Sequence, residues 1–123
     1  MSESIILVKS FDFAVRIVNL SKYLVAQQKE FVLSKQILRS GTSIGANSEE
    51  ADAAQSKKEF IAKLEIVIKE ARETHFWLRL LHKTDYIDEN MFESMLSDCN
   101  EIIAIVIAII KTTRKNLDKG ELK

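Results

Sequence analysis

The stretch that decides the fold is residues 56–83, SKKEFIAKLEIVIKEARETHFWLRLLHK. It opens with Ser56 and Glu59 in the Ser-x-x-Glu pattern, in which each side chain can accept a hydrogen bond from a free backbone amide at a helix start. Apolar or small side chains then recur at alternating four- and three-residue steps, at Phe60, Leu64, Val67, Ala71, Thr74, Leu78 and Leu81. Such spacing places them on one helix face and is typical of bundle helices. The stretch therefore predicts one long amphipathic helix.

The rest of the chain has the same helical periodicity. We predict four helices, over about residues 5–28, 34–54, 56–83 and 88–116. A polar tail, residues 117–123, follows the fourth helix. Ser34 and Asp88 are the predicted N-caps of the second and fourth helices. The chain has no proline and 3 glycines, which favours long uninterrupted helices. The connections between the predicted helices are short, so consecutive helices are expected to lie antiparallel. We expect an all-α fold, with residues 1–123 forming a single antiparallel up-down four-helix bundle.

The predicted core face of the first helix consists of Leu7, Phe11, Ala14, Ile17, Val18, Ser21, Leu24, Val25 and Gln28. The second helix is unusual because it carries two interior glycines, Gly41 and Gly45, each of which costs roughly 1 kcal/mol relative to alanine. Close approach of a neighbouring helix backbone would compensate for this cost. Residues 102–110 are rich in β-branched side chains and would also suit a buried strand. We favour a helix there, because the flanking segments keep the helical period and no turn residues bound the run.

Composition and charge restrict the class of protein. A chain of 123 residues fits one domain, and Lys+Arg and Asp+Glu are both 18, so no global basic excess attracts phosphate backbones. The single cysteine, Cys99, cannot form an internal disulfide, and the first residues lack a signal-peptide pattern. The longest apolar run is about half of the roughly 20 residues needed to span a bilayer. We expect a cytoplasmic protein with no membrane partner.

The fourth helix is apolar almost all round, because residues beside its core positions are also isoleucines or alanines. One bundle surface cannot cover such a helix on every side, so we expect the chain to bind further copies of itself. The predicted oligomer interface consists of Trp77, Ile105 and Ile109.

The residues do not indicate an enzyme. A carboxylate-bridged metal pair in a helical bundle needs Glu-x-x-His, but the residues three before His75 and His82 are Arg72 and Arg79. The two histidines are seven apart and would share a helix face, yet zinc would still need further ligands. Cys99 lies on the apolar stripe of its helix, where a core position is favoured over a nucleophile. We expect no catalytic residue, no metal and no cofactor.

Two groups of polar residues are candidate surfaces. Helical spacing places Arg39, Ser43, Asn47 and Glu50 along one side of the second helix. They suit either a recognition surface or a buried polar network among themselves, and we favour the network. The best basic patches, and hence the candidate nucleic-acid site, are Lys57, Lys58 and Lys63 at the start of the third helix and Lys111, Arg114 and Lys115 near the end of the fourth.

Three blocks together resemble a known family: residues 38–50 (LRSGTSIGANSEE), 58–60 (KEF) and 69–81 (KEARETHFWLRLL). The chain resembles the bacterial 23S rRNA intervening-sequence proteins over nearly its whole length. It is also similar to the accessory variability protein of diversity-generating retroelements. The resemblance implies a left-handed bundle that assembles into a homopentameric ring, contact with RNA or a nucleic-acid-binding protein, and no catalytic residues.

We therefore expect a non-catalytic oligomeric scaffold that associates with RNA or a nucleoprotein partner. The alternative is an oligomeric adaptor that binds only protein. In an antiparallel bundle, the start of the third helix and the end of the fourth lie at the same end, so both basic patches would share it.

Overall fold

The computed structural model describes the backbone of residues 2–118 and the side chains of residues 5–118, which fold into four α-helices. These are α1 (Ser2–Ala26), α2 (Leu33–Asp52), α3 (Lys57–Lys83) and α4 (Glu89–Asp118). Residues 2–118 contain no strand, so the all-α, four-helix prediction is confirmed. The run 102–110 is helical, as we favoured. Helix α4 continues to Asp118, so residues 117 and 118 of the predicted tail are helical, and its residues 119–123 lie outside the described part of the chain.

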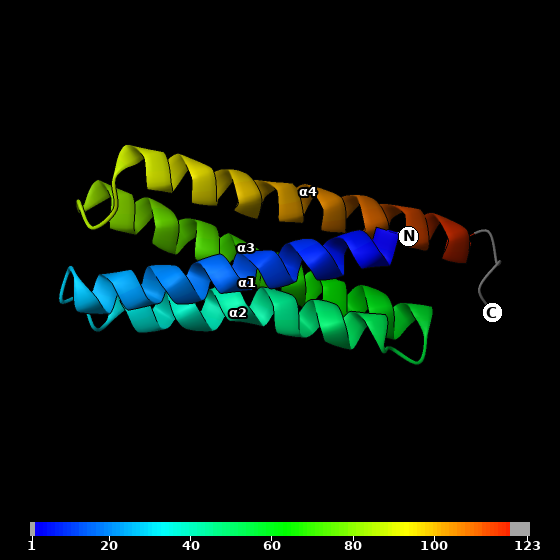
Figure 1. Ribbon diagram of the computed structural model, residues 1–123. Coiled ribbons are helices and arrows are strands. Elements are labelled where there is room, and N and C mark those ends of the chain that lie inside the picture. The colour runs from blue at the N-terminus through cyan, green and yellow to red at the C-terminus, as the bar shows by residue number, and fades with distance from the viewer. Residues whose placement is uncertain (1, 119–123) are drawn as a thin grey trace.

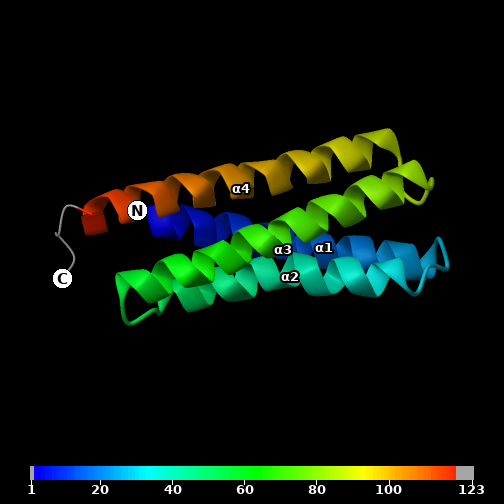
Figure 2. The same ribbon diagram turned by 180° about the vertical axis from the view of Figure 1, so that it is seen from behind.

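Helices that follow one another in the chain lie side by side and run in alternate directions (Figures 1 and 2). The α1–α2 and α3–α4 loops share one end of the molecule, which we call the loop end. The α2–α3 loop, the start of α1 and the end of α4 share the other, which we call the open end. Helices α1 and α4 also touch, but this side is packed more sparsely than the other three.

The core runs along the middle of the four helices. Its largest fully buried side chains include Phe13, Ile17, Leu24, Ile37, Ile44, Leu64, Leu78, Leu81 and Ile102. Helix α3 buries the predicted seam positions Leu64, Val67, Ala71, Thr74, Leu78 and Leu81. Buried hydrogen bonds between helices include a 2.8 Å contact from the Thr74 hydroxyl on α3 to the Ser40 hydroxyl on α2.

The predicted core face of α1 is partly wrong. Ile17 and Leu24 are buried as predicted, but Phe11 is 64% exposed and Val18 and Val25 are also exposed. The true core face consists of Ile6, Ser10, Phe13, Ile17, Leu20 and Leu24. The error arises because α1 has apolar residues on two opposite sides. Helical periodicity detects both stripes and does not say which one meets the bundle.

Gly45 has the predicted purpose of admitting a neighbouring helix backbone, whereas Gly41 makes room for a side chain. A Cβ atom on Gly41 would lie 2.6 Å from the side chain of Ile17, and one on Gly45 would lie 3.3 Å from the backbone oxygen of Ser10. Both contacts are made with α1. The close approach of α1 to α2 therefore depends on the missing side chains, which offsets the low helix propensity of glycine.

Two of the three predicted N-caps are confirmed. The Ser56 hydroxyl accepts a hydrogen bond from the amide of Glu59 at 3.0 Å, and the Asp88 carboxylate accepts one from the amide of Met91 at 2.8 Å. Ser34 is not the N-cap of α2, since it lies inside the helix and its hydroxyl donates to the Glu30 carbonyl. The Glu30 carboxylate caps the helix instead, accepting from the amides of Val32, Leu33 and Ser34 at 3.2, 3.0 and 2.7 Å.

Candidate nucleic-acid interface

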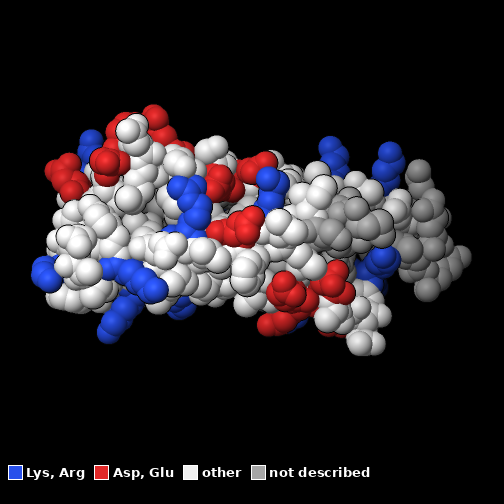
Figure 3. Space-filling view, viewed as in Figure 1, with Lys and Arg blue, Asp and Glu red and all other residues white. Residues whose placement is uncertain are grey.

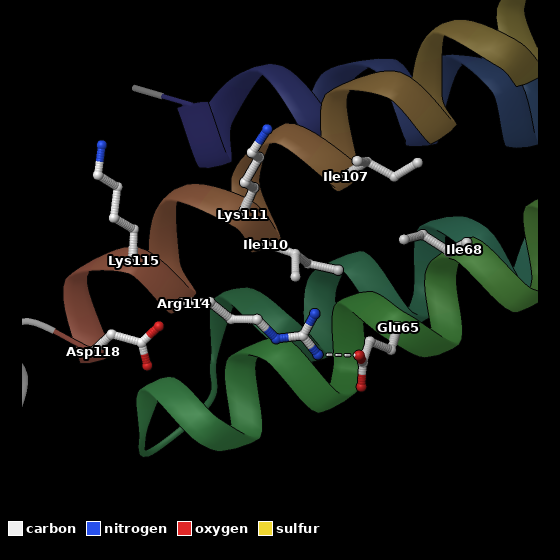
Figure 4. A pocket seen from close by; sticks show the side chains of 8 residues that line it. All are labelled: Glu65, Ile68, Ile107, Ile110, Lys111, Arg114, Lys115 and Asp118. Carbon is white, nitrogen blue, oxygen red and sulfur yellow. Dashed lines mark hydrogen bonds and ion pairs between the residues drawn. The ribbon is translucent and has the colours of Figure 1, made fainter.

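A groove of about 570 Å³ lies at the open end, between the first half of α3 and the last turns of α4 (Figure 4). Its aliphatic part is formed by Ile68, Ile107 and Ile110. Three of the predicted nucleic-acid residues, Lys111, Arg114 and Lys115, line it together with the acidic Glu65 and Asp118. The groove exists because residues 107, 110, 111, 114 and 115 follow helical spacing and so share one side of α4.

The cations of this region differ in how strongly they are already engaged. Arg114 forms an ion pair with Glu65 across the groove, and Lys63 pairs with Glu50 at 2.8 Å. The hydrogen bond and charge of Glu50 raise the pKa of Lys63, so that lysine stays protonated but is partly neutralised. Both pairs are solvent-exposed, and such pairs contribute roughly 0–1 kcal/mol, so a phosphate could displace them.

Lys57 and Lys58 occupy the first turn of α3 and are exposed. Figures 1 and 2 place this turn at the open end, so all six candidate cations share that end, as predicted. Only Lys111, Arg114 and Lys115 line the groove.

On the face drawn in Figure 3, acidic and basic side chains are mixed in the middle of the molecule and gather by sign nearer its two ends. Acidic side chains gather over the α3–α4 loop and over the end of α2, whereas basic ones gather over the α1–α2 loop and the end of α4. At the open end, the acidic last turns of α2 carry Glu49, Glu50 and Asp52. The open end therefore carries the candidate cations on its α3–α4 side and acidic side chains at the end of α2.

The polar residues of α2 do not form the predicted network among their side chains. Ser43 and Asn47 donate to the backbone oxygens of Arg39 and Ser43, each one turn earlier. The Arg39 guanidinium instead pairs with Glu70 at 3.3 Å and with Glu73, both on α3. Glu50 likewise pairs with α3, through Lys63. Arg39 and Glu50 therefore belong to exposed ion pairs between α2 and α3, whereas Ser43 and Asn47 donate within α2. The Ser40–Thr74 hydrogen bond between the same two helices is buried.

The residues predicted as an oligomer interface are partly covered within the chain. Ile105 and Ile109 pack against the chain's own core, and so does Trp77, whose indole donates to Glu73 at 3.0 Å. The isoleucine of α4 that exposes most surface is Ile107, at 43%, and it lies in the groove. The most exposed apolar side chains of the helices are on α1, where Phe11 is a predicted core residue and Val8 is not.

The remaining candidate chemical groups lie apart from one another. His82 stacks on Phe92 with a ring separation of 4.1 Å and contacts Glu89 at 2.8 Å, whereas His75 accepts from Arg79. Burial, and then Arg79 and Arg72, lower the pKa of His75. Cys99 is buried and donates to the Ala71 carbonyl, and burial raises its pKa to about 12, which suits a core side chain. Across the described residues, no three His, Cys, Asp or Glu side chains gather as metal ligands would.

The sequence matches the model of the 23S rRNA-intervening sequence protein family over residues 2–108, which is most of the chain. The chain belongs to this family. The fold agrees, since a crystal structure from Bacteroides thetaiotaomicron superimposes with a TM-score of 0.89 and 58% sequence identity. The superposition covers 90% of this chain and 99% of the Bacteroides chain. The Bacteroides protein is described as a protein of unknown function from the S23 ribosomal protein family. No curated protein matches the chain.

The region matched to the intervening-sequence family includes the start of α3 but stops before the basic side of the groove. Lys57, Lys58 and Lys63 lie inside it, and Lys111, Arg114 and Lys115 lie beyond residue 108. The family match therefore does not include these three cations of α4. None of the helices, over the residues described, is long and apolar enough to cross a membrane.

Proposed function

We propose that this chain is a non-catalytic, self-associating helical scaffold that binds structured RNA through the groove between α3 and α4. The observation that carries the proposal is the grouping of Lys111, Arg114 and Lys115 along one groove at the open end. Lysine and arginine are the side chains that contact nucleic-acid phosphates, and binding through several of them releases counterions. The family name, which refers to 23S rRNA, supports RNA as the partner class.

One groove with three cations would bind RNA weakly, and self-association would strengthen the binding. In a closed ring, every copy would present its groove on the same side, and several weak contacts would act together. The family resemblance favours five subunits in an up-down arrangement of helices. Light scattering at micromolar concentration is expected to give the mass of a closed oligomer, and a monomer at all concentrations would rule out the ring.

The decisive experiment is an electrophoretic titration against a structured ribosomal RNA fragment at two salt concentrations. Reversing the charges of Lys111, Arg114 and Lys115 to Glu is expected to weaken binding at least tenfold. A matched variant reverses Lys69, Arg72 and Lys83, which are exposed on α3 and do not line the groove, and changes the net charge equally. The matched variant is expected to retain most of the affinity if the groove is the site.

Salt adds a second criterion. The slope of log affinity against log salt is about −0.7 to −0.9 per phosphate contact, so the groove variant should show a shallower slope than wild type. Equal losses in both triple variants would indicate nonspecific attraction. Wild-type binding that is absent or insensitive to salt would contradict an RNA site.

A protein-binding adaptor is the second candidate, and the aliphatic part of the groove favours it. Single-stranded nucleic acids bind by stacking bases on aromatic side chains, and none lines this groove. Ile68, Ile107 and Ile110 with a basic rim instead suit an amphipathic helix that carries acidic residues. Under this alternative, Ile107→Ser would weaken capture of a protein partner and leave any RNA binding unchanged.

A further inference from the structure

An apolar stripe runs along the outer side of α1, facing away from the bundle core. It consists of Val8, Phe11, Val15, Val18 and Val25, all exposed, with Val8 60% and Phe11 64% accessible. The steps between successive positions are three, four, three and seven residues, which is the spacing of a helix that packs against another helix. The seven-residue step passes the exposed Lys22, so the unbroken apolar part of the stripe runs from Val8 to Val18, about 15 Å at a rise of about 1.5 Å per residue.

The described residues leave these five side chains exposed, whereas the opposite side of α1 carries the buried core residues Ile6, Phe13, Ile17, Leu20 and Leu24. A stripe of this length is larger than the isolated apolar residues that ordinary protein surfaces carry. Aliphatic side chains at helix-packing spacing indicate a helical partner surface rather than a phosphate backbone.

The charge pattern identifies what kind of partner fits. The α1–α2 hairpin is basic near its loop, with Lys22, Lys29 and Lys35, and acidic near the end of α2, with Glu49, Glu50 and Asp52. The α3–α4 hairpin has the opposite polarity. It is acidic near its loop, with Asp85, Asp88, Glu89 and Glu93, and basic near the open end. Two copies that point the same way would therefore match opposite charges at both ends when the α1–α2 side of one meets the α3–α4 side of the other.

The apolar residues agree with this arrangement. Helices α1 and α3 run in the same direction, and both end at the loop end (Figure 1). Val18 lies eight residues before the end of α1, and Phe76 lies seven residues before the end of α3. Val8 lies eighteen residues before the end of α1, and Ile66 lies seventeen residues before the end of α3. Phe76 and Ile66 are the exposed large apolar residues of α3. In side-by-side copies, the two pairs would thus lie at matching heights.

We propose that the outer stripe of α1 docks against α3 of a second copy of this chain, with both copies pointing in the same direction. This inference rests on the proposed self-association and assigns its contact surface. The contact is heterologous, since different surfaces of the two copies meet, and a heterologous contact that closes on itself generates a ring.

The first test measures mass by light scattering for wild type and for Phe11→Glu/Val15→Glu. The double variant is expected to be a monomer with unchanged helical circular dichroism, because an unpaired carboxylate in a dry contact is strongly unfavourable. A matched control, Gln55→Glu/Asn100→Glu, adds the same charge at exposed positions of the α2–α3 loop and of α4, away from α1, and is expected to remain oligomeric.

The outcomes separate the two proposals. A monomeric wild type overturns both self-association and this interface. An oligomeric wild type with an oligomeric Phe11→Glu/Val15→Glu variant overturns only the interface and leaves the scaffold proposal standing.

The second test uses disulfide trapping and does not depend on a destabilising change. Val18→Cys and Phe76→Cys chains, mixed in an oxidising buffer, are expected to form a covalent dimer, whereas neither variant alone should do so. Native Cys99 does not interfere because it is buried and its pKa is raised to about 12. Dimers from Val18→Cys alone would show that two α1 stripes face each other and would overturn the proposed arrangement, as would the absence of any trapped dimer from the mixture.

Discussion

At the level of single residues, Glu30 in the α1–α2 loop stabilises the start of α2. Its carboxylate accepts three backbone hydrogen bonds at the start of α2, and its own backbone carbonyl accepts the Ser34 hydroxyl. The side chain is buried although it is charged. A buried carboxylate is tolerated only where hydrogen bonds replace its lost hydration, and here the free amides of a helix start supply them.

We predict that Glu30→Ala lowers the free energy of unfolding by about 2–3 kcal/mol, because three amides lose a charged acceptor. Glu30→Gln should lose less, since the amide oxygen can still accept. Urea denaturation measures both. Ser34→Ala is the comparison, because Ser34 was the predicted cap, and a larger loss for Ser34→Ala than for Glu30→Ala would contradict the assignment.

The same site has a definite pH dependence. Burial acts to raise the pKa of Glu30, but hydrogen bonds from the amides of Leu33, Ser34 and Val32 outweigh it, so the pKa lies below its ordinary value of 4.5. A carboxylate with a lowered pKa stabilises the fold above the unfolded-state pKa and loses this contribution as pH falls through the folded-state value. The stability difference between wild type and Glu30→Gln should therefore be constant near neutral pH and shrink below pH 4.5.

At the scale of helices and their ends, the α3–α4 connection shows how a helix stops without glycine. Tyr86 donates its amide to the Leu81 carbonyl at 2.9 Å, and Asp85 donates to His82 at 3.1 Å. These two bonds form a Schellman motif, whose C′ residue must adopt a left-handed conformation. That residue is Asp85, with a φ of 68°.

Replacing Asp85 with glycine should therefore stabilise the protein. A left-handed conformation costs an L-residue about 1–2 kcal/mol, and glycine removes this cost. Glycine also makes the unfolded chain more flexible, which destabilises the folded state by about 0.4–1 kcal/mol. The net stabilisation is therefore roughly 0.5–1 kcal/mol. Asp85→Ala is the control and should not stabilise, because alanine tolerates this conformation less well than aspartate. A lower melting temperature for Asp85→Gly than for wild type would contradict the argument.

At the scale of the whole molecule, the described chain leaves apolar surface uncovered where a compact monomer would not. The α1–α4 side is the most sparsely packed, and the outer side of α1 is exposed along most of its length. If copies cover this surface, folding and assembly are linked by mass action, and stability depends on protein concentration.

We predict that the melting temperature of wild type rises with concentration. A hundredfold increase should add about 1–2 kcal/mol per chain, which corresponds to about 4–10 °C for a domain of this size. Differential scanning calorimetry measures the shift. The Phe11→Glu/Val15→Glu variant should show no such dependence, and a concentration-independent wild type would indicate a folding unit of one chain.

The sequence by itself determined the number, type and approximate bounds of the helices, because these depend on local features such as the capping box at Ser56 and Glu59 and the spacing of α3. It also determined that Gly41 and Gly45 serve a close helix contact, and that basic residues gather near the end of α4.

Only the tertiary structure decided which stripe of α1 is the core, because Phe11 and Phe13 satisfy the same helical period and differ only in which neighbour they meet. It also decided that Arg39 and Glu50 pair with α3 rather than with each other, and that Arg114 pairs with Glu65. Periodicity records the direction in which a side chain points along its own helix. The partner that lies in that direction depends on the rotation of each helix about its axis, which the packing of all four helices sets together.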